Sequence, residues 1–232
     1  MDDIWIFGDS FADPIWMRET KGFNWVHEIN NKYSVLNLAK IGTGPDYSLD
    51  KLKQQFVVTN KDDLKNITLI FFSADPMRLN LKCYNDPMNS AEIYAIAEGK
   101  IKHKSTWFAK QLFMWYMDHD YKERCDLQYF ATLNHMSQYF KQVLYWPVPP
   151  LTPVTNHFLD IADNFHIPEK NLIAISEVDG GPGKKAFDID PRANHLHEEN
   201  HRIMYDQLVD WIENFSPIDT SKFKFVAALE TK

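Results

Sequence analysis

The chain has 232 residues and a formal net charge of −7, and 44% of its residues are hydrophobic and 14% aromatic. This length and apolar content suffice to bury a sizeable core, which excludes a disordered chain and favours one domain over residues 1–232. Nucleic acid is an unfavourable partner, because neutralising phosphates requires clustered Lys and Arg and the sequence has no basic stripe.

No window approaches 18 consecutive apolar residues, so no membrane span is expected. The first residues are acidic and run straight into an apolar stretch, without the basic region that opens a signal peptide. We therefore expect a cytoplasmic protein. Its two cysteines, Cys83 and Cys125, have no metal-ligand spacing and are expected to be reduced thiols.

The first predicted element is a buried strand at residues 4–7, which ends at Gly8. A loop is expected over residues 13–22, because Pro14 prevents a helix from continuing directly. Helical and strand patterns then alternate, with a helix over 23–31, a strand over 33–38, a helix over 46–57 and a strand over 67–72. Strand, helix and strand at this spacing predict an α/β fold with a parallel sheet covered on both faces.

Residues 90–142 interrupt this alternation with a helical insertion, in which helices are predicted over 104–117 and 121–142. The first of these helices is apolar on more than one face and includes Trp107. Two interpretations of it stay open. It is either an ordinary core helix or a wall over an apolar substrate pocket.

The alternation resumes with a strand at 143–146, a short helix over 159–165 and a last strand at 171–175. An amphipathic helix closes the fold over residues 198–214, and its predicted inner face consists of Met204, Leu208, Trp211 and Ile212. The tail, residues 216–232, is expected to pack in part as an extended segment. No internal repeat or linker divides the chain.

Two stretches at opposite ends of the chain carry candidate chemistry. Ser10 follows the first strand after Gly8 and Asp9, so its hydroxyl is predicted at the carboxyl edge of the sheet, where open α/β sheets build their sites. A serine becomes an effective nucleophile when a base takes its proton and donors stabilise the oxyanion. His195, just before the last helix, is the predicted base, and the amide of Gly42 is a predicted oxyanion donor.

These stretches resemble the sequence blocks of the SGNH hydrolases, also called GDSL-type lipases and esterases. Residues 8–10 are similar to the first block, 37–42 to the second and 195–201 to the last. The resemblance covers residues 4–75 and 143–213. It implies a flavodoxin-like, three-layer α/β/α sandwich around a parallel sheet. It also implies a serine hydrolase that cleaves a small-molecule or glycan ester and uses no cofactor.

The resemblance further implies roles for individual residues. The backbone amides of Ser10 and Gly42 would form the oxyanion hole. Apart from the resemblance, which does not cover residue 107, we predict that Asp9, Ser73 and Trp107 contact the substrate.

One departure from the family pattern concerns the oxyanion hole. Ala74 stands where the family has an asparagine whose amide donates to the oxyanion. Losing one such donor typically costs about 10²- to 10³-fold in rate. Ser73 and Asn85 are the two candidate substitutes.

A second departure concerns the carboxylate that orients the histidine. Arg192 stands where the family usually has an aspartate. Asp190, five residues before His195, is our choice for this role, and Asp188 is the alternative. Such a carboxylate holds the imidazole tautomer and stabilises the imidazolium.

The two departures support a second hypothesis, an SGNH-fold binding or structural protein with weak or absent catalysis. A metal site at His197 and His201, which lie one helical turn apart, is disfavoured because no third ligand is evident. Residues 180–185 lack the glycine and the Ser or Thr that a phosphate-binding loop requires. The sequence leaves the substrate and the oligomeric state open.

Overall fold

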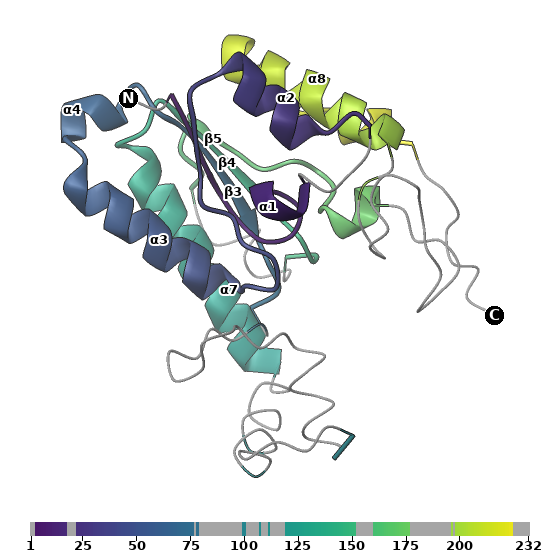
Figure 1. Ribbon diagram of the computed structural model, residues 1–232. Helices are drawn as coiled ribbons and strands as arrows, with labels where there is room; N and C mark the ends of the chain where they lie inside the picture. The colour runs from purple at the N-terminus through teal and green to yellow at the C-terminus, as the bar shows by residue number, and fades with distance from the viewer. Residues whose placement is uncertain are drawn as a thin grey trace.

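The computed structural model describes residues 3–17, 22–76, 78, 99–100, 107, 111, 119–151, 160–176, 196 and 198–224. Five strands in these residues form an all-parallel sheet in the order β2-β1-β3-β4-β5 (Figure 1). They are β1 (Ile4–Phe7), β2 (Val35–Asn37), β3 (Thr68–Ser73), β4 (Gln142–Pro147) and β5 (Phe165–His166). The predicted α/β fold with a parallel sheet is therefore confirmed.

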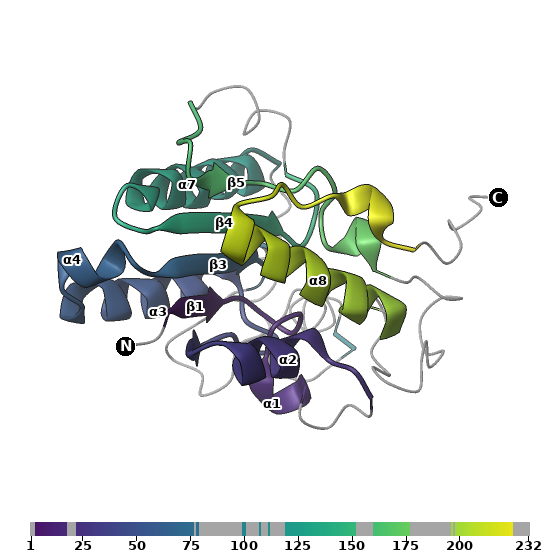
Figure 2. The ribbon, with the colours of Figure 1, turned by 90° about the horizontal axis from the view of Figure 1, so that it is seen from above.

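Helices cover both faces of the sheet. One face carries α2 (Trp25–Lys32) and α8 (Glu198–Asn214), and the other carries α3 (Pro45–Val58) and α7 (His119–Ser137) (Figures 1 and 2). Strand residues alternate between these two layers, as the period of a β-strand requires. Ile4 and Ile6 pack toward α2 and α8, whereas Trp5 and Phe7 pack toward α3 and α7.

The closing helix α8 begins and ends where the sequence predicts. Its predicted inner face is confirmed, because Met204, Leu208, Trp211 and Ile212 are all buried in one core cluster. The first long helix, α2, starts at a polar cap, where the Asn24 side chain accepts a hydrogen bond from the Val26 amide at 2.9 Å.

The loop predicted over residues 13–22 is wrong at its start, where the short helix α1 (Pro14–Met17) lies. Proline is tolerated in the first turn of a helix, because the N–H that it lacks has no partner within the helix there. Asp13 supports this start by accepting a hydrogen bond from the Ile15 amide at 2.7 Å. A second short helix, α4 (Lys61–Leu64), is not predicted by the sequence pattern.

The predictions for residues 159–175 are also wrong. No helix is present over 160–164, and the last strand is β5, which pairs with β4. The segment predicted as the last strand instead holds the 3₁₀ helix η1 (Ile173–Ile175). The Asn171 side chain accepts a hydrogen bond from the Ala174 amide at 2.9 Å, which starts this turn in place of an extended strand.

The two predicted helices of the insertion have different outcomes. The segment 104–117 lies outside the described residues except for positions 107 and 111. The second helix, α7, ends at Ser137, before the predicted boundary, because Gln142 already begins β4. In the tail, η2 (Thr220–Lys222) precedes Phe223, which packs edge-on against Trp146.

Within the part of the chain that the structure describes, no helix combines the length and the apolar character that a membrane crossing requires.

Burial of His166 predicts a pH-dependent stability. Its Nε2 accepts a hydrogen bond from the Ile218 amide at 3.1 Å, and burial lowers the pKa of His166 below its usual value. The unfolded chain therefore takes up a proton more readily than the folded one, so this contribution to stability is present above the ordinary histidine pKa and is lost as the pH falls. Urea unfolding measured at pH 7.5 and at pH 5.5 is expected to show that the free energy of unfolding falls more between these pH values in the wild type than in His166→Gln.

The variant His166→Gln keeps a side-chain acceptor but does not titrate, so it controls for the hydrogen bond itself. An identical loss of unfolding free energy in both proteins would show that His166 does not carry this effect.

Candidate active site

The loop after β1 is built around a buried carboxylate. Asp9 is 0% exposed, and its Oδ1 accepts a hydrogen bond from the Phe11 amide at 3.2 Å. The Asp9 carbonyl accepts a second hydrogen bond, from the Ala12 amide at 3.1 Å. Ser10 lies inside this turn, 5% exposed, at the carboxyl end of β1. The structure thus places Ser10 at the predicted edge of the sheet.

The sheet order makes this edge a favourable place for a site. The chain leaves β1 toward β2 on one side and returns to β3 on the other side of β1. In doubly wound sheets, ligands bind at the carboxyl ends of the strands where the order reverses in this way. Ser10 follows β1, one of the two strands at the reversal.

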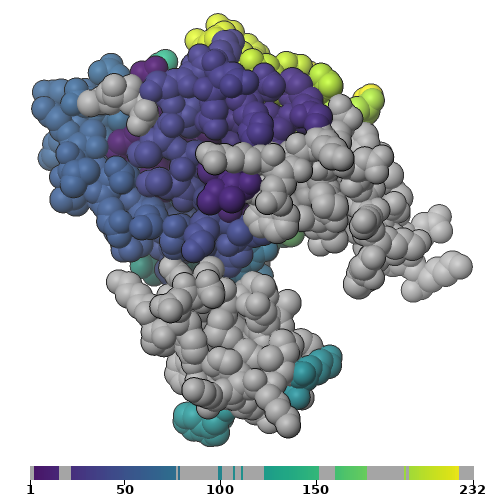
Figure 3. Space-filling model, viewed as in Figure 1, coloured from purple at the N-terminus to yellow at the C-terminus, as the bar shows by residue number. Residues whose placement is uncertain are grey.

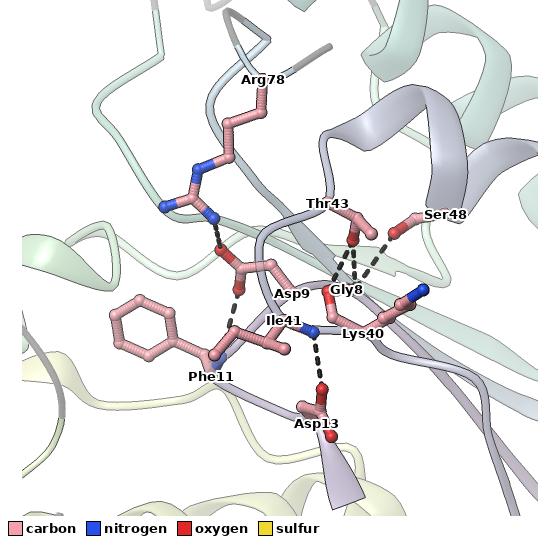
Figure 4. A network of polar contacts seen from close by, with 9 residues as sticks. All are labelled: Gly8, Asp9, Phe11, Asp13, Lys40, Ile41, Thr43, Ser48 and Arg78. Carbon is pink, nitrogen blue, oxygen red and sulfur yellow. Dashed lines mark hydrogen bonds and ion pairs between the residues drawn. The ribbon is translucent and has the colours of Figure 1, made fainter. Parts of the chain in front are cut away.

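Hydrogen bonds tie the loop after β1 to the loop after β2 (Figure 4). The Gly8 carbonyl accepts from the Lys40 amide at 3.0 Å and from the Ser48 hydroxyl at 3.3 Å. The Asp13 carboxylate accepts from the Ile41 amide at 2.6 Å. Neither Asp13 nor these cross-loop contacts were anticipated from the sequence, since they join residues far apart in the chain.

Asn37, the last residue of β2, joins the same two loops. Its side-chain amide donates to the Ala12 carbonyl at 2.9 Å, and its side-chain oxygen accepts from the Ala39 amide at 3.0 Å. Asn37 therefore uses both ends of its side chain to hold the edge of the sheet.

Gly42 lies in this network with a backbone that favours glycine. Its φ of +75° is in the left-handed region, and no atom lies within 4 Å of the position that a Cβ would take. Among the described residues, the Gly42 amide donates to no protein acceptor. This amide is therefore available for the predicted role of oxyanion donor.

Arg78 ties the loop after β3 to the same place. Its Nη1 lies 2.6 Å from Asp9 Oδ2, and its side chain is 23% exposed. The Arg78 backbone also packs directly on Gly44, where an added Cβ would lie 1.9 Å from the Arg78 carbonyl oxygen. The loops after β1, β2 and β3 thus converge on Asp9. On the face drawn in Figure 3, the darkest purple atoms, which belong to the first described residues of the chain, reach the surface only in small areas.

The predicted substrate contacts differ in their surroundings. Asp9 is buried and both of its carboxylate oxygens accept hydrogen bonds, so it acts here as a positioning residue for the loop. Ser73 and Ala74 are buried at the end of β3, and Ser73 lies beside Tyr145, whose pKa burial raises well above its usual range. Trp107 is 73% exposed. Contact of Asp9, Ser73 or Trp107 with a substrate stays a prediction.

The predicted base and its carboxylate lie outside the described residues. These are His195, Asp190 and the alternative Asp188. The neighbouring Leu196 is described and is buried in the core cluster that includes the inner face of α8. Near the start of α8, the Asn200 side chain donates to the Ile175 carbonyl at 3.0 Å.

This contact places the start of α8 near the carboxyl edge of the sheet, because η1 is itself bonded there. The Leu172 amide donates to the Pro147 carbonyl at 2.9 Å, and the Ile173 amide donates to the Val148 carbonyl at 3.1 Å. The described residues at the start of α8 therefore lie near the edge that also carries Ser10.

A metal site finds no support in the described part of the chain, where no group of three or more His, Cys, Asp or Glu is placed to hold an ion. His201, one of the pair considered from the sequence, is buried within α8.

No protein-family model matches this chain, and neither curated proteins nor solved structures gave a match.

The Asp9–Arg78 pair predicts a specific pattern of stability losses. Arg78→Met leaves a buried carboxylate without its cation, so the free energy of unfolding is expected to fall by about 3 kcal/mol. Asp9→Asn combined with Arg78→Met removes both charges and is expected to be more stable than Arg78→Met alone. Urea unfolding of the two single variants and the double variant measures this coupling. If the double variant loses the sum of the unfolding free energies that the two single variants lose, the two side chains are not coupled and the prediction is wrong.

The packing of Gly44 on Arg78 predicts that one added methyl group is costly. Gly44→Ala forces two backbone segments apart, and we expect the free energy of unfolding to fall by about 3 kcal/mol, the upper end for overpacking. Gly42→Ala is the matched control, because its Cβ meets no atom and the variant bears only the cost of a left-handed backbone, about 1 kcal/mol. A smaller loss for Gly44→Ala than for Gly42→Ala would refute this packing.

Proposed function

We propose that this chain is a serine hydrolase of the SGNH type, which cleaves a carboxylic ester through Ser10 and His195. The observation that carries the proposal is the position of Ser10. It follows β1 at the strand-order reversal of a parallel sheet, in a turn that a buried aspartate and two neighbouring loops hold in place. Rigid support of this kind is what a nucleophile needs for productive geometry.

The chemistry follows from the residue types. Ser10 Oγ would attack the ester carbonyl while His195 takes its proton, and His195 would then return that proton to the departing alcohol. Water would hydrolyse the acyl-enzyme by the same exchange of protons. Asp190 would orient the imidazole of His195, with Asp188 as the alternative.

The oxyanion hole would consist of the backbone amides of Ser10 and Gly42. The Gly42 amide, which donates to no acceptor in the described residues, supports this role. Ala74 offers no side-chain donor at the end of β3. We therefore expect a slower enzyme than one with a complete oxyanion hole.

The finer fold assignment belongs to the same proposal. We infer a flavodoxin-like SGNH sandwich, because the strand order β2-β1-β3-β4-β5 is the one that flavodoxin-like sheets have. The substrate class is a small-molecule or glycan ester.

Hydrolysis of a short-chain 4-nitrophenyl ester tests the proposal. Ser10→Ala and His195→Ala are each expected to lower kcat/KM by about 10³-fold or more, because each removes a group that acts in bond formation. Ser34→Ala and His135→Ala are the matched controls. Ser34 is exposed and directly precedes β2, and His135 lies in the last turn of α7, shortly before β4 begins, so both lie toward the opposite, amino end of the strands. Both controls are expected to retain the wild-type rate.

Equal rates in the wild type and all four variants would count against an esterase and in favour of a binding or structural protein. Circular dichroism of each variant confirms that a lost rate does not reflect a lost fold.

A further inference from the structure

Arg78 has more hydrogen-bond donors than Asp9 uses. A guanidinium carries five N–H donors in a planar fork. Among the described residues, Arg78 makes one side-chain hydrogen bond, from Nη1 to Asp9 Oδ2. Figure 4 shows the other terminal nitrogen pointing away from Asp9. The edge formed by Nε and Nη2 is therefore not used by any described residue.

The guanidinium is also held in a fixed orientation. Asp9 is fully buried and is itself fixed by the Phe11 amide, while the Arg78 backbone packs against Gly44. At 23% exposure, the Arg78 side chain remains open to a small ligand. A donor edge that is already oriented binds with a smaller entropic cost than a mobile one.

Arg78 contacts the residue that directly precedes the candidate nucleophile. Asp9, the partner of Arg78, directly precedes Ser10, and consecutive Cα atoms lie about 3.8 Å apart. A substrate whose carbonyl is placed at Ser10 therefore extends close to Arg78. The two-donor edge of a guanidinium matches the two oxygens of a carboxylate, with which it forms a pair of parallel hydrogen bonds.

We propose that the ester cleaved at Ser10 carries a carboxylate, and that the Nε–Nη2 edge of Arg78 binds it. This inference rests on the proposed function and adds the substrate class. A singly charged carboxylate suits the site better than a doubly charged phosphate, because the buried carboxylate of Asp9 already pairs with the single positive charge of Arg78. With a formal net charge of −7, the chain does not attract anions from a distance, so recognition depends on this direct contact.

Two esters of equal carbon number test the proposal, 4-nitrophenyl hydrogen adipate and the uncharged 4-nitrophenyl hexanoate. The informative variant is Arg78→Lys, because a lysine ammonium keeps a cation beside Asp9 but loses the Nε–Nη2 edge. Arg78→Lys is expected to lower kcat/KM about 10- to 100-fold more for the adipate ester than for the hexanoate ester, mainly through KM. Arg124→Lys, an exposed substitution on α7, is the matched control.

Equal losses on the two esters would overturn the proposal, since they would indicate a general effect of Arg78 on the loop or on the reacting carbonyl. Unchanged rates on both esters would overturn it as well.

A binding measurement separates this inference from the proposed function. Calorimetry with Ser10→Ala and with Ser10→Ala/Arg78→Lys measures affinity for both esters without turnover. The adipate ester is expected to bind about 10- to 100-fold more weakly to the double variant, with no change for the hexanoate ester. If the wild type hydrolyses neither ester, the proposed function fails. The difference in affinity for the adipate ester between Ser10→Ala and the double variant still decides whether Arg78 binds a carboxylate. Equal affinities would refute the carboxylate site.

Discussion

The contact between Arg78 and the buried carboxylate of Asp9 is the interaction on which the candidate site depends. A carboxylate that is fully removed from water is costly unless a cation and hydrogen-bond donors compensate it. Asp9 obtains both, from a residue beyond β3 and from the turn that contains Ser10. The desolvation cost of one side chain thus couples the nucleophile loop to a distant loop. Loss of Arg78 leaves that cost uncompensated, so the position has little freedom to vary while Asp9 is present.

The sheet explains why these loops meet at all. Strand residues on both faces are buried under helices, so the sheet edges and loops are the places left for polar chemistry. Parallel strands bring their carboxyl ends to one edge of the sheet. At that edge the chain runs from β1 to β2 on one side and from β2 to β3 on the other side of β1, so the loops after β1 and β3 diverge and leave room between them. The Gly8 carbonyl, Asn37 and Asp13 then hold neighbouring loops together by hydrogen bonds. Rigidity at this edge is supplied by backbone and short polar groups.

The sequence predicts the long buried strands and the closing helix, because hydrophobic periodicity within one segment marks them. The apolar runs of β1, β3 and β4 and the spacing of α8 were read correctly, because their periodicity reflects burial on two faces or on one. The strand β5 has two residues, too few to show a period, and the apolar run near Ile175 was mistaken for it. Arg78 was missed for another reason. Its partner lies 69 residues earlier, and no local pattern marks such a pair.

Covalent labelling of Ser10 by a fluorophosphonate tests the central claim most directly. The reagent reacts with serines whose hydroxyl is activated and placed beside oxyanion donors, and peptide mapping by mass spectrometry identifies the modified residue. Our account predicts one label per chain, on Ser10. A folded protein that takes up no label, or that carries it on a serine away from the carboxyl edge of the sheet, would contradict the account.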